Sequence, residues 1–489
     1  MGLRINTNIS AISALRNLGI ASRAQENSMR RLSTGLRITR ASDDPSGLVI
    51  SEQLRAQIGS LGQALENAET ASNVIGTAEA ALSEVSDLLV KIRESAIFAL
   101  NDGGASTEQI QAEQDSVNAA VNAIDKISQN TRFGKMNLLD GSSAIQVNNQ
   151  SAAIADLNIK NINFDGFASR DFTVDVTAIA EQASTDTGIA SNAAITTAAG
   201  NVVFQISGNR GTQTITLGSA VNASALYNAI NMVALNTGVY ATNDGTVVLR
   251  SIDFGEDAFI TLQQVGGSGA FTAGEVQNQQ GVDIEGTING LKATGMGSKL
   301  SVYKSDLAVS IGMEVSATGA DYATQAYTFT AVKSGLNFQI GSEATPNDAV
   351  RVSFQNMNSG LLGSPETTVS LGGGNTLTMG GILSTIRQGG KNDLFADPGN
   401  AVRIVDDALD DVNGMRSFLG SLQSDTFESA IDSLGVAIEN LSGAESQIRD
   451  LDFAAETAEF TRTQIMFQAG MAVMASANMT PQTVLTLLQ

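Results

Sequence analysis

The sequence contains no cysteine, no histidine and no tryptophan. Without cysteine, the chain can form neither a disulfide framework nor a reactive thiol. Without histidine and cysteine, it also lacks the usual ligands of zinc and haem and the base of a serine–histidine site. Carboxylates, lysine or serine could still serve an enzyme, but no carboxylate pair can be argued to be catalytic from its spacing. The composition therefore predicts a protein that is not an enzyme and holds no cofactor or metal.

Basic residues are few, with 28 Lys and Arg against 50 Asp and Glu and a net charge of −22. This charge disfavours nucleic acid as a partner and favours a soluble, self-repelling surface. The sequence has no apolar window of about 18 residues, so we expect no membrane span and no membrane partner. The first twenty residues lack the apolar run of roughly 7–15 residues that a cleavable secretory signal needs. If the protein leaves the cell, it does so by a route that needs no such signal.

The C-terminal end carries an apolar stripe with a strict spacing of seven. A helical pattern runs from Ile448 at least to Met479, with Pro481 setting off the final apolar residues. Burying large apolar side chains stabilises by roughly 1.5–3 kcal/mol each, so the stripe requires a partner surface. Docking on the helix's own domain core is the ordinary alternative. The residues of the stripe are Phe453, Phe460, Phe467, Met471 and Met474.

The N-terminal end shows a matching pattern. Residues 1–42 are expected to form an amphipathic helix, because apolar residues recur at steps of three and four. Seven arginines and one glutamate give this segment a charge of +6, whereas residues 450–489 carry −3. We therefore expect the two ends to pack on each other. The apolar residues are Ile5, Ile9, Ile12, Leu15 and Leu18, and further on Met29, Leu32 and Leu36.

A long helical hairpin is expected next. Asp43-Asp44-Pro45 is a strong helix start, because an Asp cap precedes a proline in the first turn. From there to Leu100 apolar residues hold a seven-residue register, which ends at a turn signal at residues 101–104. A second helix follows. The seven-residue register comprises Leu54, Leu61, Ala68, Ile75, Leu82, Leu89 and Ala96.

The middle of the chain changes to a period of two. From about residue 166 short alternating runs indicate strands, interrupted by a short helix that ends near Gly238. A further hairpin is expected near Gly335, and helix resumes at about Asn400. Glycine clusters at 266–269 and 372–374 lack the Lys of a phosphate-binding loop and are read as turns. The acidic loop 253–257 lacks the ligand spacing of an EF-hand.

Both ends carry motifs of one protein family. The N-terminal motifs are residues 6–8 (NTN), 31–38 (RLSTGLRI) and 41–48 (ASDDPSGL). The C-terminal motifs are residues 448–458 (IRDLDFAAETA), 468–470 (QAG) and 481–485 (PQTVL). They closely resemble the terminal signatures of bacterial flagellin over roughly residues 1–140 and 400–489. The hairpin at 335–357 and the stretch Ser207–Leu262 also resemble segments found in some flagellins.

The resemblance implies an α+β fold with three parts. Residues 1–42 with 450–489 would be terminal helices that form a coiled coil in a filament core. Residues 43–165 with 333–449 would form a helical shell domain with a β-hairpin, and 166–332 a β-rich, solvent-exposed variable domain. The expected function is that of a structural subunit of the extracellular flagellar filament, used for swimming motility. Export would occur in the unfolded state through the flagellar type III apparatus.

The resemblance also implies partners. The main one is a homopolymer of many copies in a helical filament, because a head-to-tail contact that does not close generates an open helix. Hook-associated junction proteins, cap proteins and an export chaperone are expected as well. The predicted polymerisation interface comprises Ile5, Ile9, Ile12, Leu15, Leu18, Leu32, Leu36, Phe453, Phe460, Phe467, Met471, Met474, Leu485 and Leu488.

The sequence differs in one place from the flagellins that an innate Toll-like receptor senses. The family's receptor patch aligns with residues 90–97, where Arg93 and Glu94 match the pattern. Lys91 replaces an Arg, and Lys lacks the planar fork needed for a bidentate contact. Ser95 replaces a Leu. These changes predict weak receptor activation.

Alternative functions remain open at this point. A hook–filament junction protein shares both terminal patterns, although the complete C-terminal signature favours a filament subunit. The variable domain could act as an adhesin, which a surface-binding screen would distinguish from a passive spacer. An enzymatic insert of the zinc-peptidase kind is excluded, because the sequence has no histidine.

Overall fold

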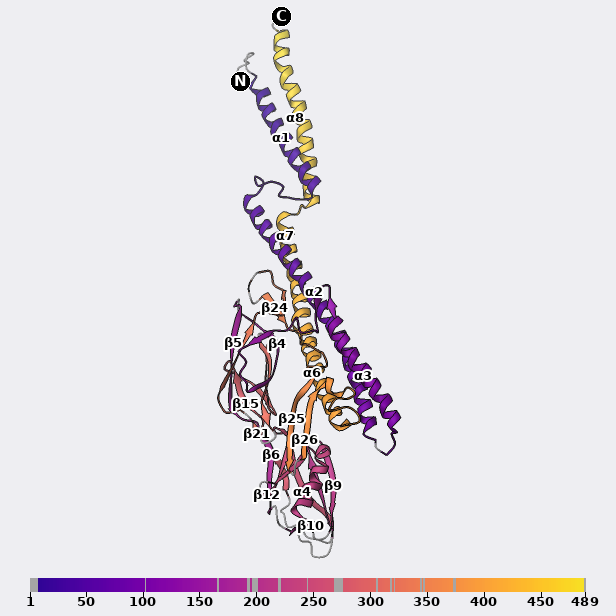
Figure 1. The fold of residues 1–489 in the computed structure, drawn as a ribbon. Coiled ribbons are helices and arrows are strands. Elements are labelled where there is room, and N and C mark those ends of the chain that lie inside the picture. The colour runs from indigo at the N-terminus through magenta and orange to yellow at the C-terminus, as the bar shows by residue number, and fades with distance from the viewer. Residues whose placement is uncertain are drawn as a thin grey trace. The chain divides into compact units, whose positions relative to one another are not determined.

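The computed structural model describes residues 8–101, 103–164, 167–190, 194–195, 201–218, 221–243, 245–267, 276–304, 307–316, 319–320, 322–343, 345, 348–372 and 375–487. The fold is α+β, as expected, with long helices from both ends of the chain and strands from its middle (Figure 1). The chain divides into two compact units. One unit comprises Met1–Asn67, Gly341–Glu343 and Ser429–Gln489, and the other Ala68–Ile340 and Ala344–Glu428.

The first unit contains the terminal helices α1 (Ile9–Thr34) and α8 (Phe453–Leu487) together with α7 (Ser429–Arg449). The N-terminal helix is shorter than the expected range 1–42. It ends at Thr34, because Gly35 adopts a left-handed conformation with φ of 69° and its N–H closes the last turn on the Arg31 carbonyl.

The C-terminal pattern also differs from the expected single helix. The helix breaks after Arg449 and restarts at Phe453, where Asp452 Oδ1 accepts hydrogen bonds from the N–H groups of Ala454 and Ala455. This is an N-cap. Pro481 does not end α8, which continues to Leu487.

Helix α2 (Pro45–Ala99) begins where Asp43-Asp44-Pro45 predicts. Asp44 Oδ1 accepts from the Gly47 N–H at 2.9 Å, so the carboxylate caps the first turn. The division between the two units falls within α2, after Asn67. The predicted helical hairpin is present, because α3 (Thr107–Asn130) follows with a complete capping box between Ser106 and Gln109.

In the second unit, α2, α3 and α6 (Pro398–Ser421) each bury one apolar face. From Ala68 the predicted seven-residue register of α2 is buried throughout. Helix α6 is followed by the π-helical segment η3 (Leu422–Glu428). Side chains from α6 also bond to α2, where Arg416 Nη2 lies 2.9 Å from Glu79 Oε1. The buried α6 residues include Ala401, Ile404, Val405, Ala408, Val412, Met415 and Leu419.

Two sheets enclose the first β core, whose buried members include Phe172 and Phe329 stacked at 5.1 Å. The first sheet runs β16 (Leu291–Lys292), β15 (Glu285–Ile288), β5 (Ser169–Ala178), β22 (Ala326–Val332) and β3 (Gln146–Asn148). The second sheet runs β17 (Thr294–Met296), β18 (Lys299–Tyr303), β19 (Leu307–Met313) and β4 (Ile154–Ile162). Strands β3 and β4 precede residue 166, yet they pair with strands from the range 166–332.

A second β core is built from residues between Ala183 and Leu262. One sheet runs β11 (Val239–Asn243), β12 (Thr246–Phe254) and β6 (Gln182–Ala190). The other runs β14 (Val276–Gln280), β13 (Phe259–Gly267), β8 (Val202–Gly208) and β9 (Gly211–Leu217). The predicted short helix is present as α4 (Ala223–Met232) and α5 (Ala234–Thr237), ending at Gly238. The chain enters and leaves this part beside a β-bridge between Glu181 and Val282.

Short two-stranded antiparallel sheets complete the second unit. They are β1 (Arg132–Phe133) with β2 (Met136–Asn137), β7 (Ala194–Ile195) with β10 (Val221–Asn222), β20 (Val315–Ser316) with β21 (Gly319–Ala320), β23 (Leu336–Gln339) with β24 (Ala349–Val352), and β25 (Gly363–Gly372) with β26 (Asn375–Ile382). The hairpin expected near Gly335 is thus β23–β24. The hairpin β25–β26 was not anticipated; it leads through η2 (Leu383–Ile386) toward α6.

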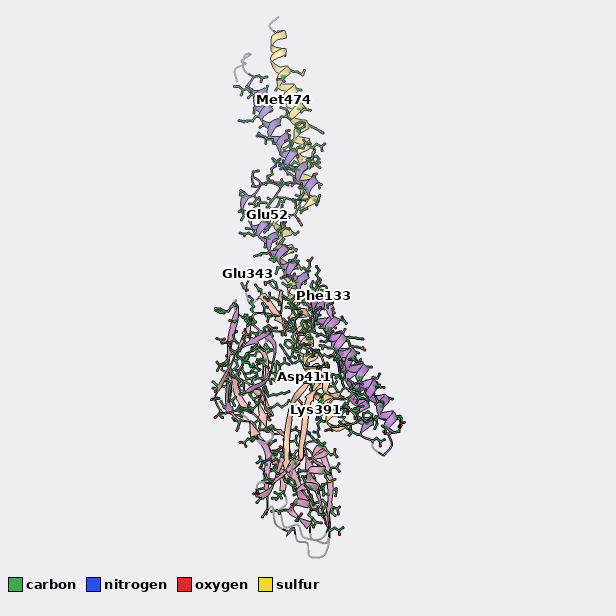
Figure 2. All side chains as sticks on the ribbon, viewed as in Figure 1. Glu52, Phe133, Glu343, Lys391, Asp411 and Met474 are labelled. Atoms are coloured by element: carbon green, nitrogen blue, oxygen red, sulfur yellow. The ribbon has the colours of Figure 1, made fainter. Side chains whose placement is uncertain are left out.

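A polar face of α6 ties this helix to the β-rich part of the same unit. Arg403 donates to the Leu235 carbonyl at the end of α5, and Asp411 Oδ2 accepts from the Gly363 N–H of β25 at 3.3 Å. Asp407 Oδ2 accepts from the Ser364 hydroxyl. Because these residues are spaced by four, they lie on one side of the helix. Figure 2 labels Asp411 in this region.

Candidate functional site

The terminal helices α1 and α8 pair in antiparallel fashion (Figure 1). Asn8 Nδ2 donates to the Ala477 carbonyl at 2.8 Å near one end. Near the other end, Arg31 Nη1 lies 3.6 Å from Glu456 Oε2. Gly35 faces the ring of Phe453, and the place of a Cβ on Gly470 lies 3.3 Å from Leu18 Cδ1. These contacts define one register along the whole described pair.

Small and polar residues occupy the buried seam. Along α8 two heptad rows face α1, one with large side chains and one with smaller or polar side chains. Continuing the register places Phe460, Phe467 and Met474 opposite small residues of α1, and Figure 2 labels Met474 on α8. Each large residue of one helix thus packs over a small residue of the other, which lets the two backbones approach closely. The buried seam residues are Ala14, Ala21 and Ser28 on α1, and Glu456 and Thr463 on α8.

Large apolar side chains of both helices remain exposed to solvent after the two helices pair. On α1 Ile9 is 68% exposed, and on α8 Phe453 is 54% exposed. Exposed apolar patches of this kind mark interaction surfaces, because a soluble protein gains free energy by covering them. We call this set the apolar flank; it comprises Ile9, Ile12, Leu15, Ile20 and Met29 of α1, and Phe453, Ile465, Met466, Met471, Val473 and Met479 of α8.

The predicted interface residues fall into four groups. Leu18, Leu32, Phe460, Phe467 and Met474 are half-buried members of the seam rows. The apolar flank contains five of them: Ile9, Ile12, Leu15, Phe453 and Met471. Met471 is thus exposed, although the sequence placed it in one stripe with Phe460, Phe467 and Met474. Leu36 is half-buried in the segment after α1. Leu485 lies in α8 with its side chain outside the description, and Ile5 and Leu488 lie outside the described residues.

The sequence reasoning missed the small residues of the seam. The prediction relied on large apolar side chains. Ala14, Ala21 and Ser28 also repeat at a spacing of seven, but they are small and contribute little to a hydrophobic pattern. The same holds for Thr463 and Gly470. A search for small residues at heptad spacing on both helices would have found them. Ile20, Ile465 and Val473 of the apolar flank were also missed, because they lie off the expected stripe.

Charge contributes less to the pairing than the sequence suggested. Of the oppositely charged residues on the two helices, Arg31 and Glu456 form an ion pair across the seam. Arg462 pairs within α8 with Glu459 at 2.6 Å, and this contact raises the pKa of Arg462. The exposed pair within α8 contributes about 0–1 kcal/mol, and a pair with a buried carboxylate, like the one across the seam, is often neutral for stability, so apolar packing dominates the pairing.

The residues expected to form a receptor patch lie on α2, apart from these helices in the sequence. Lys91 and Glu94 are exposed. Arg93 Nε lies 2.6 Å from Asp406 Oδ1 of α6, and this hydrogen bond raises the pKa of Arg93. Ser95 is buried and donates its hydroxyl to Glu113 Oε2 at 2.6 Å. Ser95 therefore faces α3 and offers no contact area to a receptor.

The acidic loop 253–257 contains an ion pair, and the glycine clusters at 266–269 and 372–374 lie partly outside the described residues. Asp253 is occupied by Arg210, whose Nε donates to Asp253 Oδ2 at 2.9 Å. Within the described ranges no cluster of three or more acidic side chains is arranged to hold a metal ion. No helix in the described part of the chain is long and apolar enough to span a bilayer. The paired helices α1 and α8 offer an exposed apolar surface for packing.

Comparison with known proteins identifies relatives of both ends and of the whole chain. The family model for the bacterial flagellin N-terminal helical region matches residues 5–144, and that for the C-terminal helical region matches residues 402–488. A flagellin of Salmonella typhimurium is 30% identical over 511 residues, which cover 99% of each chain. The B-type flagellin of Pseudomonas aeruginosa is 29% identical over 542 residues, and flagellin A of Helicobacter pylori 27% over 532, each covering both chains completely.

Proposed function

The chain belongs to the bacterial flagellin family, and from this premise we propose that the paired helices α1 and α8 carry its polymerisation surface. As a flagellin it is a structural, non-enzymatic subunit of the extracellular flagellar filament, which serves motility. The filament is a homopolymer. The proposal assigns the contacts between copies to particular side chains.

The apolar flank is the observation that carries this proposal. It combines aliphatic, aromatic and methionine side chains that α1 and α8 leave uncovered after pairing with each other. Covering one such side chain stabilises by roughly 1.5–3 kcal/mol, so several together supply a strong drive for association. Methionine adapts to more than one packing arrangement, which suits a contact between copies in a helical array.

The three ranges of the chain receive roles on the same basis. Residues 1–42 and 450–489 are assigned to the filament core, 43–165 and 333–449 to the surrounding shell, and 166–332 to the outer surface. The family models support an outer role for the middle of the chain, because their matches at 5–144 and 402–488 leave residues 145–401, which include 166–332, unmatched. A segment that varies within a family of polymers is expected where few contacts between copies constrain it.

Seeded polymerisation followed by electron microscopy tests the proposal. Filaments should grow from the full chain and not from a chain that lacks residues 450–489. A sharper pair of variants uses two neighbours on α8: Ile465→Ser in the apolar flank and Gln464→Ala at an exposed polar position. Ile465→Ser should raise the critical concentration about ten-fold, since about 1.4 kcal/mol of contact energy is lost. Equal critical concentrations for the two variants would contradict the proposal.

The remaining partners follow from the same surface. We propose that the export chaperone covers the apolar flank of α8 before assembly, and that the junction and cap proteins contact the terminal helices in the finished filament. Export through the flagellar type III apparatus in the unfolded state suits a chain without disulfides. Ile465→Ser, tested against Gln464→Ala, should weaken chaperone capture; full retention would separate the chaperone site from the apolar flank.

Weak recognition by the innate receptor is proposed on two grounds. Lys91 lacks the fork of an arginine, and Arg93 is already engaged by Asp406. Lys91→Arg should therefore raise the response of receptor-expressing reporter cells. A response of the unaltered protein equal to that of a strong activator would refute the proposal.

A further inference from the structure

The break between α7 and α8 has no local cause in the sequence. Residues 449–453 read Arg-Asp-Leu-Asp-Phe and contain neither glycine nor proline, the residues that end helices most strongly. Apolar residues continue across them at Ile448, Leu451 and Phe453, which is why a single helix was expected from Ile448 onward. Asp452 caps the start of α8, but a cap favours a helix start without forbidding a continuous helix. The chain therefore needs a further contact to end α7 at Arg449.

That contact comes from the segment after α1. Leu36 and Asp450 form an antiparallel bridge, and the Leu451 N–H donates to the Gly35 carbonyl at 3.0 Å. The Arg37 N–H donates to the Arg449 carbonyl at 2.7 Å. The Arg37 guanidinium donates through Nη2 to the Ile448 carbonyl. One residue from the N-terminal part of the chain thus binds two carbonyls at the end of α7.

These carbonyls are the groups that a helix end leaves without partners. The last four C=O groups of an α-helix have no N–H within the helix, and they carry the negative end of its dipole. A guanidinium there supplies both donors and positive charge. Arg37 thereby caps α7 although it lies 411 residues away in the sequence.

The surroundings hold Arg37 in place. The next residue, Ile38, is buried, and a Cβ on Gly47 would lie 2.8 Å from Ile38 Cδ1, so glycine at position 47 leaves room for the Ile38 side chain. Asp43 Oδ2 accepts from the Thr39 N–H, the Thr39 hydroxyl and the Arg40 N–H, and the hydroxyl contact lowers the pKa of Asp43. On the other side Arg449 Nη1 bonds to Glu52 Oε1 at 2.7 Å.

We propose that Arg37 is a positioning residue for assembly, which ends α7 and thereby sets where α8 begins. The start of the C-terminal helix is then dictated by the N-terminal segment rather than by its own sequence. When residues 35–37 are not docked, α7 continues through residues 450–452 and the heptad rows of α8 rotate away from those of α1. Arg37 itself lies outside the polymerisation surface proposed above and would act on it through the start of α8.

Arg37→Gln and Arg40→Gln form a matched pair for the test. Both side chains are exposed and both changes remove one positive charge from the same segment, but the Arg40 side chain makes none of the contacts described above. Arg37→Gln should raise the critical concentration for seeded growth about five- to ten-fold and speed hydrogen exchange at Leu451, whose N–H is freed. Arg40→Gln should change neither. Equal behaviour of the two variants would overturn the proposal.

A rescue experiment separates helix termination from general loss of stability. Asp450→Gly disfavours helix at residue 450 by about 0.3 kcal/mol, because aspartate is already a poor helix former and glycine is only slightly worse. If Arg37 acts by ending α7, the double variant Arg37→Gln/Asp450→Gly should recover part of the growth lost in Arg37→Gln. A double variant that grows no better than Arg37→Gln would refute the role in helix termination. The apolar flank is intact in all of these chains, so failure here leaves the Ile465→Ser test of the polymerisation surface unaffected.

Discussion

Glu456 is buried between α1 and α8, with Oε2 3.6 Å from Arg31 Nη1 and with no hydrogen-bond partner for Oε1 among the described residues. A carboxylate in this position has lost water without gaining a full set of donors. Ion pairs of this kind are often neutral or unfavourable for stability compared with an apolar residue. Their contribution is to favour one register of a helix pair over others.

The first prediction follows from this arrangement. Glu456→Leu should stabilise the pairing of α1 with α8 by about 1–2 kcal/mol, because the cost of burying the charge disappears. Thermal depolymerisation of filaments, followed by circular dichroism, would measure the change. Glu456→Gln, which keeps the shape and removes the charge, should lie between the two. A loss of several degrees in Glu456→Leu would show that the ion pair is strongly favourable.

The second prediction concerns close packing in the seam. A Cβ on Gly470 would lie 3.3 Å from Leu18 Cδ1, whereas a Cβ on Gly443 in α7 would meet nothing within 4 Å. Gly443→Ala should therefore stabilise by up to about 1 kcal/mol through helix propensity alone. Gly470→Val should instead destabilise the pair by roughly 1–3 kcal/mol, because extra atoms must force the helices apart. Filament melting temperatures that rise in both variants would contradict the described seam.

The third prediction is a pH dependence within the second unit. Burial raises the pKa of Asp411 from 3.8 to about 6, opposed by Lys299 and by the Gly363 N–H, and supported by Asp156 and Asp407. The folded pKa exceeds the unfolded one, so this group favours folding at low pH. Its unfavourable contribution grows as the pH rises from about 4 to about 6, up to roughly 3 kcal/mol at neutral pH.

The variant Asp411→Asn checks this sign. Asparagine keeps an acceptor for the Gly363 N–H and carries no charge. It should raise the melting temperature at pH 7 and change it little at pH 4, which flattens the dependence between these values. Burial also raises the pKa of the nearby Asp407, although the hydrogen bond from Ser364 opposes this shift. Some pH dependence of the melting temperature should therefore remain in Asp411→Asn. Equal effects of Asp411→Asn at both pH values would rule out Asp411 as the titrating group.

The fourth prediction concerns a buried amide in the helical part of the second unit. Gln114 Nε2 donates to the Ile386 carbonyl at 3.0 Å, and Gln114 Oε1 accepts from the Leu394 N–H at 2.8 Å. Gln114→Leu would leave both backbone groups buried without partners, at a cost of roughly 2–4 kcal/mol. Urea unfolding would measure it. A change below 0.5 kcal/mol, a threshold about the size of ordinary surface effects, would mean that water replaces the amide.

The sequence predicted the long helices well, because their signals are local and repeated. The register of α2 from Ala68 onward and its start at Pro45 depend on heptads and on a capping carboxylate, both visible within a few residues. The break after Arg449 could not be predicted, since its partner Arg37 lies far away in the sequence. The end of α1 could have been found, as glycine at position 35 is a common helix terminator.

The sequence predicted that the middle of the chain is β-rich, but not how its strands pair. Alternation identified strands, but pairing depends on contacts distant in sequence, such as β4 with β19 and β3 with β22. The hairpin β25–β26 was missed because its glycine cluster was read as an isolated turn. For the candidate site, the large apolar residues were identifiable, whereas the buried alanines and Thr463 gave no hydrophobic signal.

The bridge between Glu181 and Val282 brings together the two ends of the segment that builds the second β core. The two residues exchange hydrogen bonds, with Glu181 N–H to Val282 carbonyl at 2.9 Å and Val282 N–H to Glu181 carbonyl at 3.0 Å. The segment between them therefore joins the first β core at a single residue pair, whose Cα atoms lie about 5.5 Å apart. A short turn could connect these two residues in place of the whole segment. The same pair is a natural splice site for grafting a foreign domain onto the chain.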